Sequence, residues 1–270
     1  MRKIAFIGVG NMANAIIGGL LRCGAVDPFH LILCDKFPDK CGEYVQSGAV
    51  LASSPAEAVR DADCVVLSVK PQNFPEVLAE LSAVAGIENK LFVTIAAGIT
   101  VQTVKNALHG APVVRVLPNT PMLIGQGVSV ICRAEDVAAE DFAFVKSMFE
   151  ASGSVTVIDE SEMNRIISVT SSSPAYVFAF IDAICEGAKA QGLDADALLS
   201  SVCDRVIGSA MLLKQDTLTP AEQIRRVTSK GGTTERAMNV LYQRDMTAMV
   251  VDAMKACTAR AEEMGRATRD

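Results

Sequence analysis

The chain has 270 residues, of which 50% are hydrophobic and 21% are charged, and its formal net charge is −6. This length and apolar content suffice for two domains with hydrophobic cores and exclude intrinsic disorder. The acidic balance argues against nucleic acid as a partner, because binding phosphates needs clustered Lys and Arg. No apolar run approaches the roughly 20 residues that span a bilayer, and the N-terminus lacks a signal-peptide pattern. We therefore expect a cytoplasmic protein with no membrane partner.

The N-terminal segment carries a nucleotide-binding motif. The apolar run Lys3–Val9 leads into Gly8-Val9-Gly10-Asn11-Met12-Ala13, and a helical pattern follows. The first glycine permits a tight turn, the second lets a pyrophosphate reach the backbone, and the small Ala13 lets the helix pack on the strand. A second apolar run, Leu31–Cys34, ends in Asp35, the acidic position expected roughly 20 residues beyond the glycines. This context favours a dinucleotide site over a purely structural strand-to-helix turn.

Strand-like runs then alternate with helical patterns up to about residue 135. The runs Cys64–Val69, Leu91–Ile95 and Val113–Leu117 follow the helix candidates Ser54–Arg60, Phe74–Leu81 and Val101–Leu108. This alternation predicts a parallel sheet with right-handed crossovers. The strand candidates end at Ser68-Val69-Lys70-Pro71, Ala96-Ala97-Gly98 and Pro118-Asn119-Thr120-Pro121. Because ligands of open α/β sheets bind outside the carboxyl ends of strands, we expect these segments to line a cofactor crevice, with ordinary turns as the alternative.

The second half of the chain has a different pattern. Runs at Val128–Cys132 and Val155–Ile158 bracket a helix candidate, Ala138–Phe149, and would extend the sheet. From Asp159 onward apolar residues recur at helical spacing, with long stretches at Ala195–Leu213 and Asp245–Met264. We predict a dinucleotide-binding domain over residues 1–158 and an all-α domain over residues 159–270. Helices that are apolar on more than one side favour an interwoven dimer, with a monomeric bundle as the alternative.

Metal and histidine chemistry are not expected. The eight cysteines include no C-x-x-C pair, and the histidines are His30 and His109 alone. Most of the cysteines lie in apolar stretches, which is typical of small buried hydrophobic residues in a reducing compartment. We therefore predict no metal site and assign the difficult chemical step to a cofactor.

The segment Val227-Thr228-Ser229-Lys230-Gly231-Gly232-Thr233-Thr234 predicts a site for a small carboxylate. Adjacent glycines let the backbone approach a ligand, and the turn leads into a helix whose first N–H groups have no intrahelical partner. Such an N-terminus attracts anions, and the hydroxyls of Ser229, Thr233 and Thr234 add donors. The alternative is a plain helix start with a threonine N-cap.

Taken together, the motifs resemble the pyrroline-5-carboxylate reductase family over essentially the whole chain. The segments that carry the resemblance are Gly8-x-Gly10-Asn11-Met12, Ser68-Val69-Lys70-Pro71, Ala96-Ala97-Gly98-Ile99-Thr100, Pro118-Asn119-Thr120-Pro121, Ser173-Pro174-Ala175-Tyr176 and residues 227–234. The resemblance implies an α/β Rossmann-like N-terminal domain and an all-α C-terminal dimerisation domain. It also implies NAD(P)H-dependent reduction of 1-pyrroline-5-carboxylate to L-proline, the last step of proline biosynthesis, by a homodimer that is often assembled further.

The resemblance and the strand-end positions together assign the site residues. The cofactor would be held by Gly8, Val9, Gly10, Asn11, Met12, Asp35, Lys36, Ser68, Val69, Lys70, Pro71, Ala97 and Asn119. The substrate would be held by Ser229, Gly231, Gly232, Thr233, Thr234 and Glu160. Thr234 would be the catalytic residue, with its hydroxyl at the ring nitrogen.

The chain departs from the family pattern in places. Lys230 stands where the family usually has Pro, and Ser171-Ser172-Ser173 stands before Pro174 in place of a Ser-Gly-Ser-Gly run. The segment Cys34-Asp35-Lys36 lacks the Ser, Asn and Arg that commonly meet a 2′-phosphate. Asp35 would repel that phosphate while Lys36 would attract it. We expect NADPH as the cofactor, with NADH also usable.

Two other functions remain as alternatives. A 3-hydroxyacid dehydrogenase of the 6-phosphogluconate type uses a Lys, with an Asn nearby, on the first long helix of its second domain, and the stretch Ser173–Ala183 has neither. A non-enzymatic NADP(H)-sensing protein would leave the Gly231–Thr234 loop without a purpose.

Overall fold

The computed structural model describes residues 2–267. Packing divides this part of the chain into two compact units, of which the first comprises residues 2–174 and 256–267 and the second residues 175–255. Residues 159–174 and the end of the last helix thus pack with the N-terminal residues. No helix among residues 2–267 combines the length and apolar character needed to cross a membrane.

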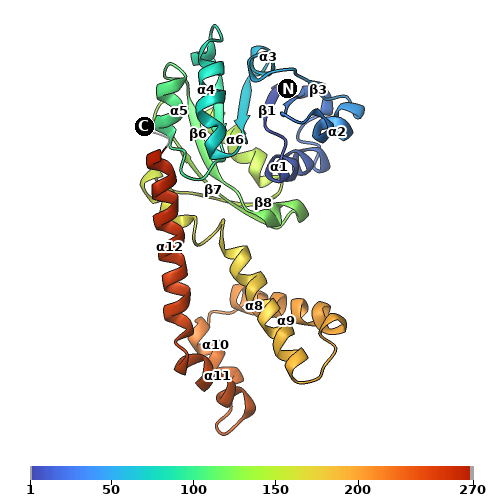
Figure 1. The fold of residues 1–270 in the computed structure, drawn as a ribbon, viewed down its shortest axis with the longest axis vertical. Helices are drawn as coiled ribbons and strands as arrows, with labels where there is room; N and C mark the ends of the chain where they lie inside the picture. Colours follow the sequence, from blue (N-terminus) through green and yellow to red (C-terminus); the bar gives the residue numbers. More distant parts are fainter. Residues whose placement is uncertain (1, 268–270) are drawn as a thin grey trace. The chain divides into compact units, whose positions relative to one another are not determined.

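The first unit is built on a sheet that, within residues 2–267, has eight strands in the order β3-β2-β1-β4-β5-β6-β7-β8 (Figure 1). The strands are β1 (Ile4–Ile7), β2 (Leu31–Cys34), β3 (Val50–Leu51), β4 (Cys64–Leu67), β5 (Leu91–Thr94), β6 (Val113–Leu117), β7 (Gly127–Arg133) and β8 (Gly153–Val157). Strands β1 to β6 are parallel, as the alternation predicted. The strand order reverses between β1 and β4, and nucleotides bind at such a switch point.

Strand β7 runs antiparallel to β6. The link 118–126 between them is too short for the crossover of a dozen or more residues that a parallel neighbour requires. The longer connection from β7 to β8 contains a helix, α6, and β8 is accordingly parallel to β7. The predicted extension of the sheet is therefore confirmed, and the connection lengths explain the direction of each added strand.

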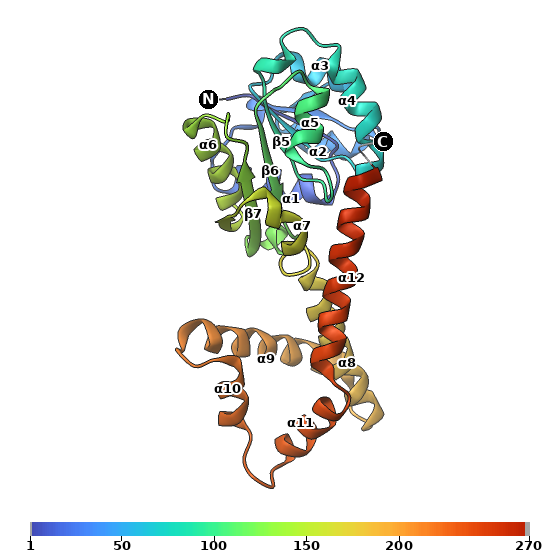
Figure 2. The same cartoon turned by 90° about the vertical axis from the view of Figure 1, so that its left-hand side faces the viewer.

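Helices cover both faces of the sheet. They are α1 (Asn11–Arg22), α2 (Gly42–Gln46), α3 (Pro55–Arg60), α4 (Phe74–Ser82), α5 (Val101–Ala107), α6 (Ala139–Glu150) and α7 (Met163–Ile166). Helices α1 and α6 pack on one face and α3, α4 and α5 on the other (Figure 2). Every residue of β1 and β4 is buried, which explains why these strands are continuous apolar runs and not alternating ones.

The second unit is entirely helical, as the sequence predicted. Its helices are α8 (Ser173–Ala190), α9 (Ala195–Gln215), α10 (Pro220–Val227), α11 (Thr233–Gln243) and α12 (Met246–Ala267), of which α12 extends into the first unit. Helix α10 was not predicted, because residues 220–226 are mostly polar. Its start is instead fixed by a capping box, in which the Thr219 N–H donates to Glu222 at 2.8 Å and the Glu222 N–H donates to the Thr219 hydroxyl at 3.3 Å.

The cysteines behave as the sequence predicted. All eight are free of disulfides, and Cys34, Cys41, Cys64, Cys132 and Cys185 are buried. Burial raises the pKa of Cys34 to about 11, so this thiol stays protonated and unreactive near neutral pH although it lines a cavity.

Candidate functional site

A cavity of about 690 Å³ lies at the carboxyl ends of β1, β2 and β4, at the point where the strand order reverses. The predicted cofactor residues that line it are Gly8, Gly10, Asp35, Lys36, Ser68, Val69 and Lys70. We call this cavity the nucleotide crevice. The fold thus brings predicted cofactor residues from the ends of three different strands to one cavity.

The glycine turn is shaped for a phosphate. Gly8 has a φ of +94°, and a Cβ built on it would lie 3.0 Å from the backbone carbonyl of Ser68. A Cβ on Gly10 would meet no atom within 4 Å, so the backbone there is open to a ligand. Helix α1 begins at this point without a side-chain cap, and within residues 2–267 the N–H groups of Asn11, Met12 and Ala13 have no acceptor. These free donors at a helix N-terminus fit a pyrophosphate.

Two side chains brace the turn from neighbouring strands. The Ser68 hydroxyl donates to the carbonyl oxygen of Gly8 at 2.6 Å. One oxygen of Asp35 accepts the Val9 N–H at 2.7 Å, and the other accepts the Phe37 N–H at 2.8 Å and the Lys40 ammonium at 3.3 Å. The Asp35 side chain is only 9% exposed. It therefore points into the turn that it supports.

These contacts set the charge of Asp35. Burial by itself would raise the pKa of the Asp35 carboxyl group, but the N–H donors of Phe37 and Val9 and the Lys40 ammonium outweigh it and hold the pKa below its ordinary value. The carboxylate is thus ionised at neutral pH and partly compensated by Lys40. Lys36 and Lys40 both line the crevice, where a 2′-phosphate would need cations.

Part of the crevice wall was not predicted from the sequence. Phe37, Lys40, Ser53 and Ser54 also line the crevice. Ser53 and Ser54 follow β3, which has two residues only and gives no recognisable apolar run. The signal for Phe37 and Lys40 was their position directly after the predicted strand Leu31–Cys34.

The other predicted cofactor residues have different surroundings. Val9 is buried under the turn, and Asn11, Met12 and Pro71 flank the crevice without lining it. Ala97 lies in the loop 96–100 after β5. Asn119 is 6% exposed, and its side-chain amide donates to the Thr170 carbonyl at 3.1 Å and accepts the Val128 N–H at 2.9 Å. Its polar atoms thus hold the chain after β6 in place.

The predicted carboxylate site lies in the second unit, and it consists of residues 229–232 and the first two residues of α11, Thr233 and Thr234. We call residues 229–234 the carboxylate loop. Gly231 has a φ of +77° and its N–H donates to Glu235 at 2.8 Å. The Gly232 N–H donates to the Ser229 carbonyl at 3.0 Å, and Gly232, not a threonine, is the N-cap. Among the described residues, the N–H groups and hydroxyls of Thr233 and Thr234 have no partner. The loop therefore presents two free backbone donors and two free hydroxyls at a helix N-terminus, which suits a carboxylate.

Glu160 has partners within the first unit. Its carboxylate accepts the Val101 N–H at 2.7 Å and lies 3.5 Å from a guanidinium nitrogen of Arg115. A substrate contact for Glu160 stays a prediction.

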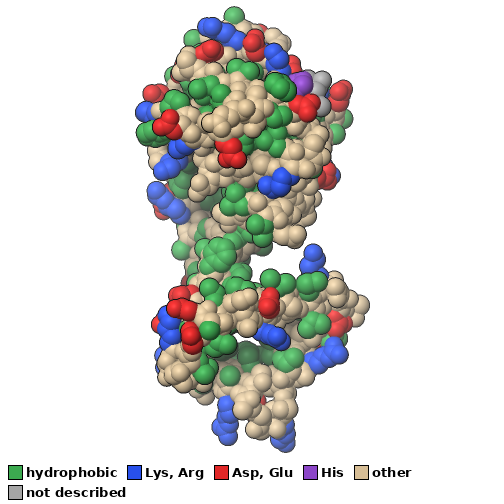
Figure 3. Space-filling model, turned by 90° about the vertical axis from the view of Figure 1, so that its right-hand side faces the viewer, with side chains coloured by type: hydrophobic (Ala, Val, Ile, Leu, Met, Phe, Trp, Pro, Cys, Tyr) green, Lys and Arg blue, Asp and Glu red, His purple; other side chains and the backbone are tan. Residues whose placement is uncertain are grey.

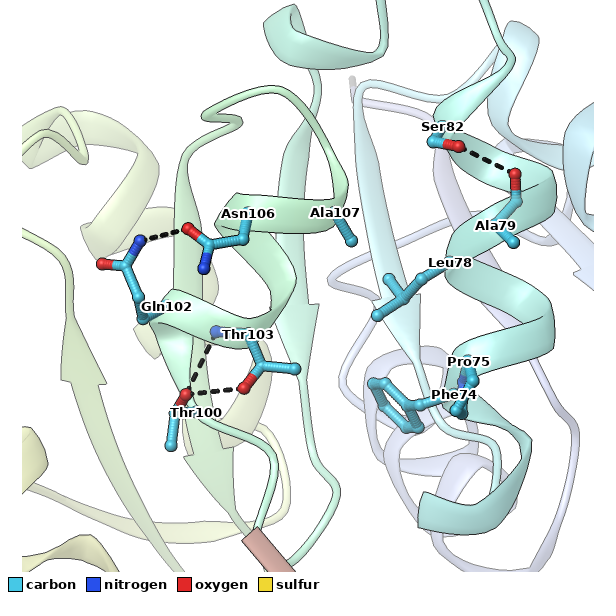
Figure 4. Close-up of a pocket in the computed structure, with 10 residues that line it drawn as sticks. All are labelled: Phe74, Pro75, Leu78, Ala79, Ser82, Thr100, Gln102, Thr103, Asn106 and Ala107. Carbon is cyan, nitrogen blue, oxygen red and sulfur yellow. Dashed lines mark hydrogen bonds between the residues drawn. The ribbon is translucent and has the colours of Figure 1, made fainter. Parts of the chain in front are cut away.

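A second cavity, of about 770 Å³, lies between α4 and α5 (Figure 4). Its walls are formed by apolar side chains such as Leu78 and neutral polar ones such as Thr103 and Asn106. It contains no charged group among the described residues that line it and none of the predicted site residues. The nucleotide crevice, with its glycine turn and lysines, is the better fit for a dinucleotide.

Known proteins place the chain in one family. Residues 160–264 match the family model described as pyrroline-5-carboxylate reductase dimerisation, and residues 3–98 match that described as NADP oxidoreductase coenzyme F420-dependent. The chain is 34% identical over 267 residues to the pyrroline-5-carboxylate reductase of Escherichia coli, which covers 98% of this chain and 99% of that one. A crystal structure of 1-pyrroline-5-carboxylate reductase from Streptococcus pyogenes has a TM-score of 0.89 at 29% identity and covers 97% of this chain and 98% of that one.

The likeness of fold extends to more distant relatives. Pyrroline carboxylate reductase from Plasmodium falciparum, crystallised with NADP bound, has a TM-score of 0.90 at 24% identity over 98% of each chain. The similarity in sequence and in fold covers nearly the whole chain and therefore both units. The chain therefore belongs to the pyrroline-5-carboxylate reductase family.

Proposed function

We propose that this protein reduces 1-pyrroline-5-carboxylate to L-proline with NADPH as the hydride donor. The observation that carries this proposal is the family membership over nearly the whole chain, at 34% identity to the Escherichia coli enzyme. The open glycine turn and the free donors of the carboxylate loop support it, because a dinucleotide and a small carboxylate need these two kinds of site. A 3-hydroxyacid dehydrogenase and an NADP(H) sensor have no comparable support.

The chemistry needs orientation more than acid or base strength. When bound, NADPH would supply the hydride that adds to the imine carbon, C2, of protonated 1-pyrroline-5-carboxylate, so that the C=N bond becomes the C–N single bond of a secondary amine. The N-terminus of α1 holds the pyrophosphate. The N–H groups of Thr233 and Thr234 hold the substrate carboxylate, and the Thr234 hydroxyl hydrogen-bonds the ring nitrogen. These contacts restrict the imine to one orientation, which is the main source of acceleration for such a reactive acceptor.

The direct test follows nicotinamide absorbance with pyrroline-5-carboxylate as the added substrate. We expect NADPH oxidation that depends on the imine and yields stoichiometric proline. NADPH oxidation or NADP⁺ reduction only with a 3-hydroxyacid would instead support the dehydrogenase. NADPH binding without turnover on either substrate would support the sensor.

The surroundings of Asp35 lead to a prediction about cofactor choice. We expect Asp35→Asn to raise the ratio of kcat/KM for NADPH to that for NADH, because it removes a negative charge beside Lys40 while keeping an acceptor for the turn. A unit charge about 4 Å away in water is worth about 1 kcal/mol, which corresponds to a change of roughly fivefold in the ratio.

The matched control is Asp39→Asn, since Asp39 is an exposed carboxylate nearby that does not line the crevice. Steady-state kinetics with both cofactors measure the ratio. An unchanged ratio in Asp35→Asn would show that the Asp35 charge does not act on the 2′-phosphate.

We propose a homodimer whose interface is formed by the second unit. Within residues 175–255, Cys185 and Ala195 alone are buried. Large apolar side chains on four helices lie open, including Phe178 at 61%, Ile207 at 57%, Val240 at 55% and Met249 at 59% exposure. Figure 3 shows hydrophobic side chains gathered at the surface of this helical part. A monomer rarely exposes so much apolar surface, and the matched dimerisation model covers these residues.

The assembly prediction is that the protein sediments at twice the mass of the chain, or a multiple of it, at micromolar concentration. We also expect Phe178→Asp to shift the equilibrium toward monomer, because a partner would bury the charge without a counter-ion. Asp182→Asn serves as a control on the same helix. A wild-type monomer would contradict the proposed interface.

We further propose a division of labour between a dinucleotide-binding domain at 1–158 and a dimerisation and substrate domain at 159–270. The match at residues 160–264 supports this boundary.

We also propose a cytoplasmic location, since eight unpaired cysteines suit a reducing compartment. Fractionation of the native cells with an antibody tests it.

A further inference from the structure

Arg115 is the one charged side chain in the buried core of the described residues, at 1% exposure in the middle of β6. Its strand neighbours Val113 and Leu117 belong to the core beneath α4 and α5, so the guanidinium enters that core. Burial lowers the pKa of Arg115, and the carboxylate of Glu160 opposes this shift. A charge in such a place is expensive unless it is paired, and apolar residues would fill the space at least as stably.

The partners of Arg115 come from one segment. One terminal nitrogen donates to Asn164 Oδ1 at 2.7 Å, and the other lies 3.5 Å from Glu160 Oε1. The same Glu160 oxygen accepts the N–H of Val101, the first residue of α5, at 2.7 Å. Glu160 therefore joins the sheet to the N-terminus of α5, where a carboxylate is also favoured by the helix dipole.

The elements joined in this way adjoin a loop that is predicted to bind the cofactor. Helix α5 follows the loop 96–100, which contains Ala97. On another side this loop packs on α12, since a Cβ on Gly98 would lie 2.9 Å from the Gly265 nitrogen. Glu160 and Asn164 belong to residues 159–172, which we call the connector because they lead into α8.

The connector is held at its far end as well, where the Thr170 carbonyl accepts from Asn119. Both Arg115 and Asn119 are carried by β6 and the turn that follows it. Strand β6 and the turn after it therefore fix the connector at two points, and through Glu160 they also fix the N-terminus of α5, which follows the loop 96–100.

We propose that Arg115 is a positioning residue for hydride transfer, which acts through Glu160 and Asn164 to hold the start of α5 and the connector in register. This proposal rests on the proposed function. Hydride transfer requires the reacting atoms at near-contact distance, and a misplacement of about 1 Å can slow a reaction roughly 100-fold. Arg115 thus affects the rate of the chemical step through Glu160 and Asn164, while it touches neither reactant itself.

The test uses Arg115→Met, Glu160→Ala, the conservative Glu160→Gln and the double variant Arg115→Met/Glu160→Ala. The control is Asp136→Asn, which breaks the 2.8 Å ion pair between Asp136 and Lys105. Lys105 belongs to α5 but lies away from the N-terminus of that helix. We expect Arg115→Met and Glu160→Ala each to lower kcat by roughly 10- to 100-fold. The kcat of Glu160→Gln should lie between those of the wild type and Glu160→Ala. NADPH affinity should stay within about threefold. The primary kinetic isotope effect with deuterated NADPH should rise, because hydride transfer becomes rate-limiting.

The double variant separates positioning from substrate contact. If Arg115 acts through Glu160, the double variant should be no slower than the slower single variant, as for residues of one network. Additive losses, with the substrate KM raised only when Glu160 is changed, would overturn the proposal and make Glu160 a substrate ligand. Unchanged kcat and isotope effect in folded Glu160→Ala would overturn it as well, whether or not Arg115→Met folds.

Amide hydrogen exchange tests the contact without turnover. Exchange at residues 99–104 should accelerate in Glu160→Ala and stay unchanged in Asp136→Asn. Failure of the wild-type protein to reduce pyrroline-5-carboxylate would refute the proposed function, whereas unaltered exchange at residues 99–104 in Glu160→Ala would refute the positioning role.

Discussion

Thr234→Ala is expected to lower kcat/KM for pyrroline-5-carboxylate by roughly 10- to 150-fold, the equivalent of one hydrogen bond to a charged group at about 1.5–3 kcal/mol. The Thr234 hydroxyl has no hydrogen-bond partner among the described residues, and the side chain is exposed, so the substitution removes no internal hydrogen bond and opens no cavity in the core. The melting temperature and the Kd for NADPH should therefore stay close to those of the wild type. Steady-state kinetics, thermal melts and NADPH titration measure the three quantities.

Two further substitutions at this position sharpen the test. Thr234→Val keeps the shape of the side chain without its hydroxyl and should be as slow as Thr234→Ala. Thr234→Ser keeps the hydroxyl and should recover most of the activity. Full activity in Thr234→Val would show that the hydroxyl has no part in the reaction and that the loop acts through its backbone alone.

Gly10→Ala is expected to weaken NADPH binding by roughly 10- to 150-fold, because its Cβ would project where a pyrophosphate approaches the N–H groups of α1 and would break at least one charge-assisted hydrogen bond. No atom of the protein lies within 4 Å of that Cβ. The ligand-free protein should consequently melt within about 4 °C of the wild type, the shift expected for about 1 kcal/mol at a helix N-cap.

Gly8→Ala is the matched comparison, because its effect should fall on the fold as well. Gly8 has a φ of +94°, and its Cβ would press on the Ser68 backbone at 3.0 Å. A left-handed non-glycine residue costs about 1–3 kcal/mol, so both the melting temperature and the NADPH affinity should drop. If Gly10→Ala bound NADPH normally, the pyrophosphate would not lie against this turn.

The elements of the first unit were largely predictable because each depends on residues close together in the chain. Strands β2 and β6 begin and end at the predicted residues, and the start of α3 after Ser54 agrees with the capping bond from Glu57. The exceptions have physical causes. Strand β3 is too short to show a pattern, and α10 has caps without an apolar stripe. The N-cap of α11 is Gly232, because Thr233 and Thr234 are already the first two residues of the helix.

By itself, the sequence determined the glycine turn, the alternating strands and helices, and the glycine-containing start of α11, since these follow from local backbone freedom and hydrophobic spacing. Only the tertiary structure decided what the charged groups do, because their partners come from elements distant in the chain. Asp35, predicted to hold the cofactor, accepts the N–H of Val9, 26 residues earlier, and also lines the nucleotide crevice. Glu160, assigned to the substrate by resemblance, accepts that of Val101, 59 residues earlier. The sequence around Arg115, an apolar run, did not indicate that its guanidinium would pair with the Glu160 carboxylate. The guanidinium needs a partner only once the helices pack over the sheet and bury it.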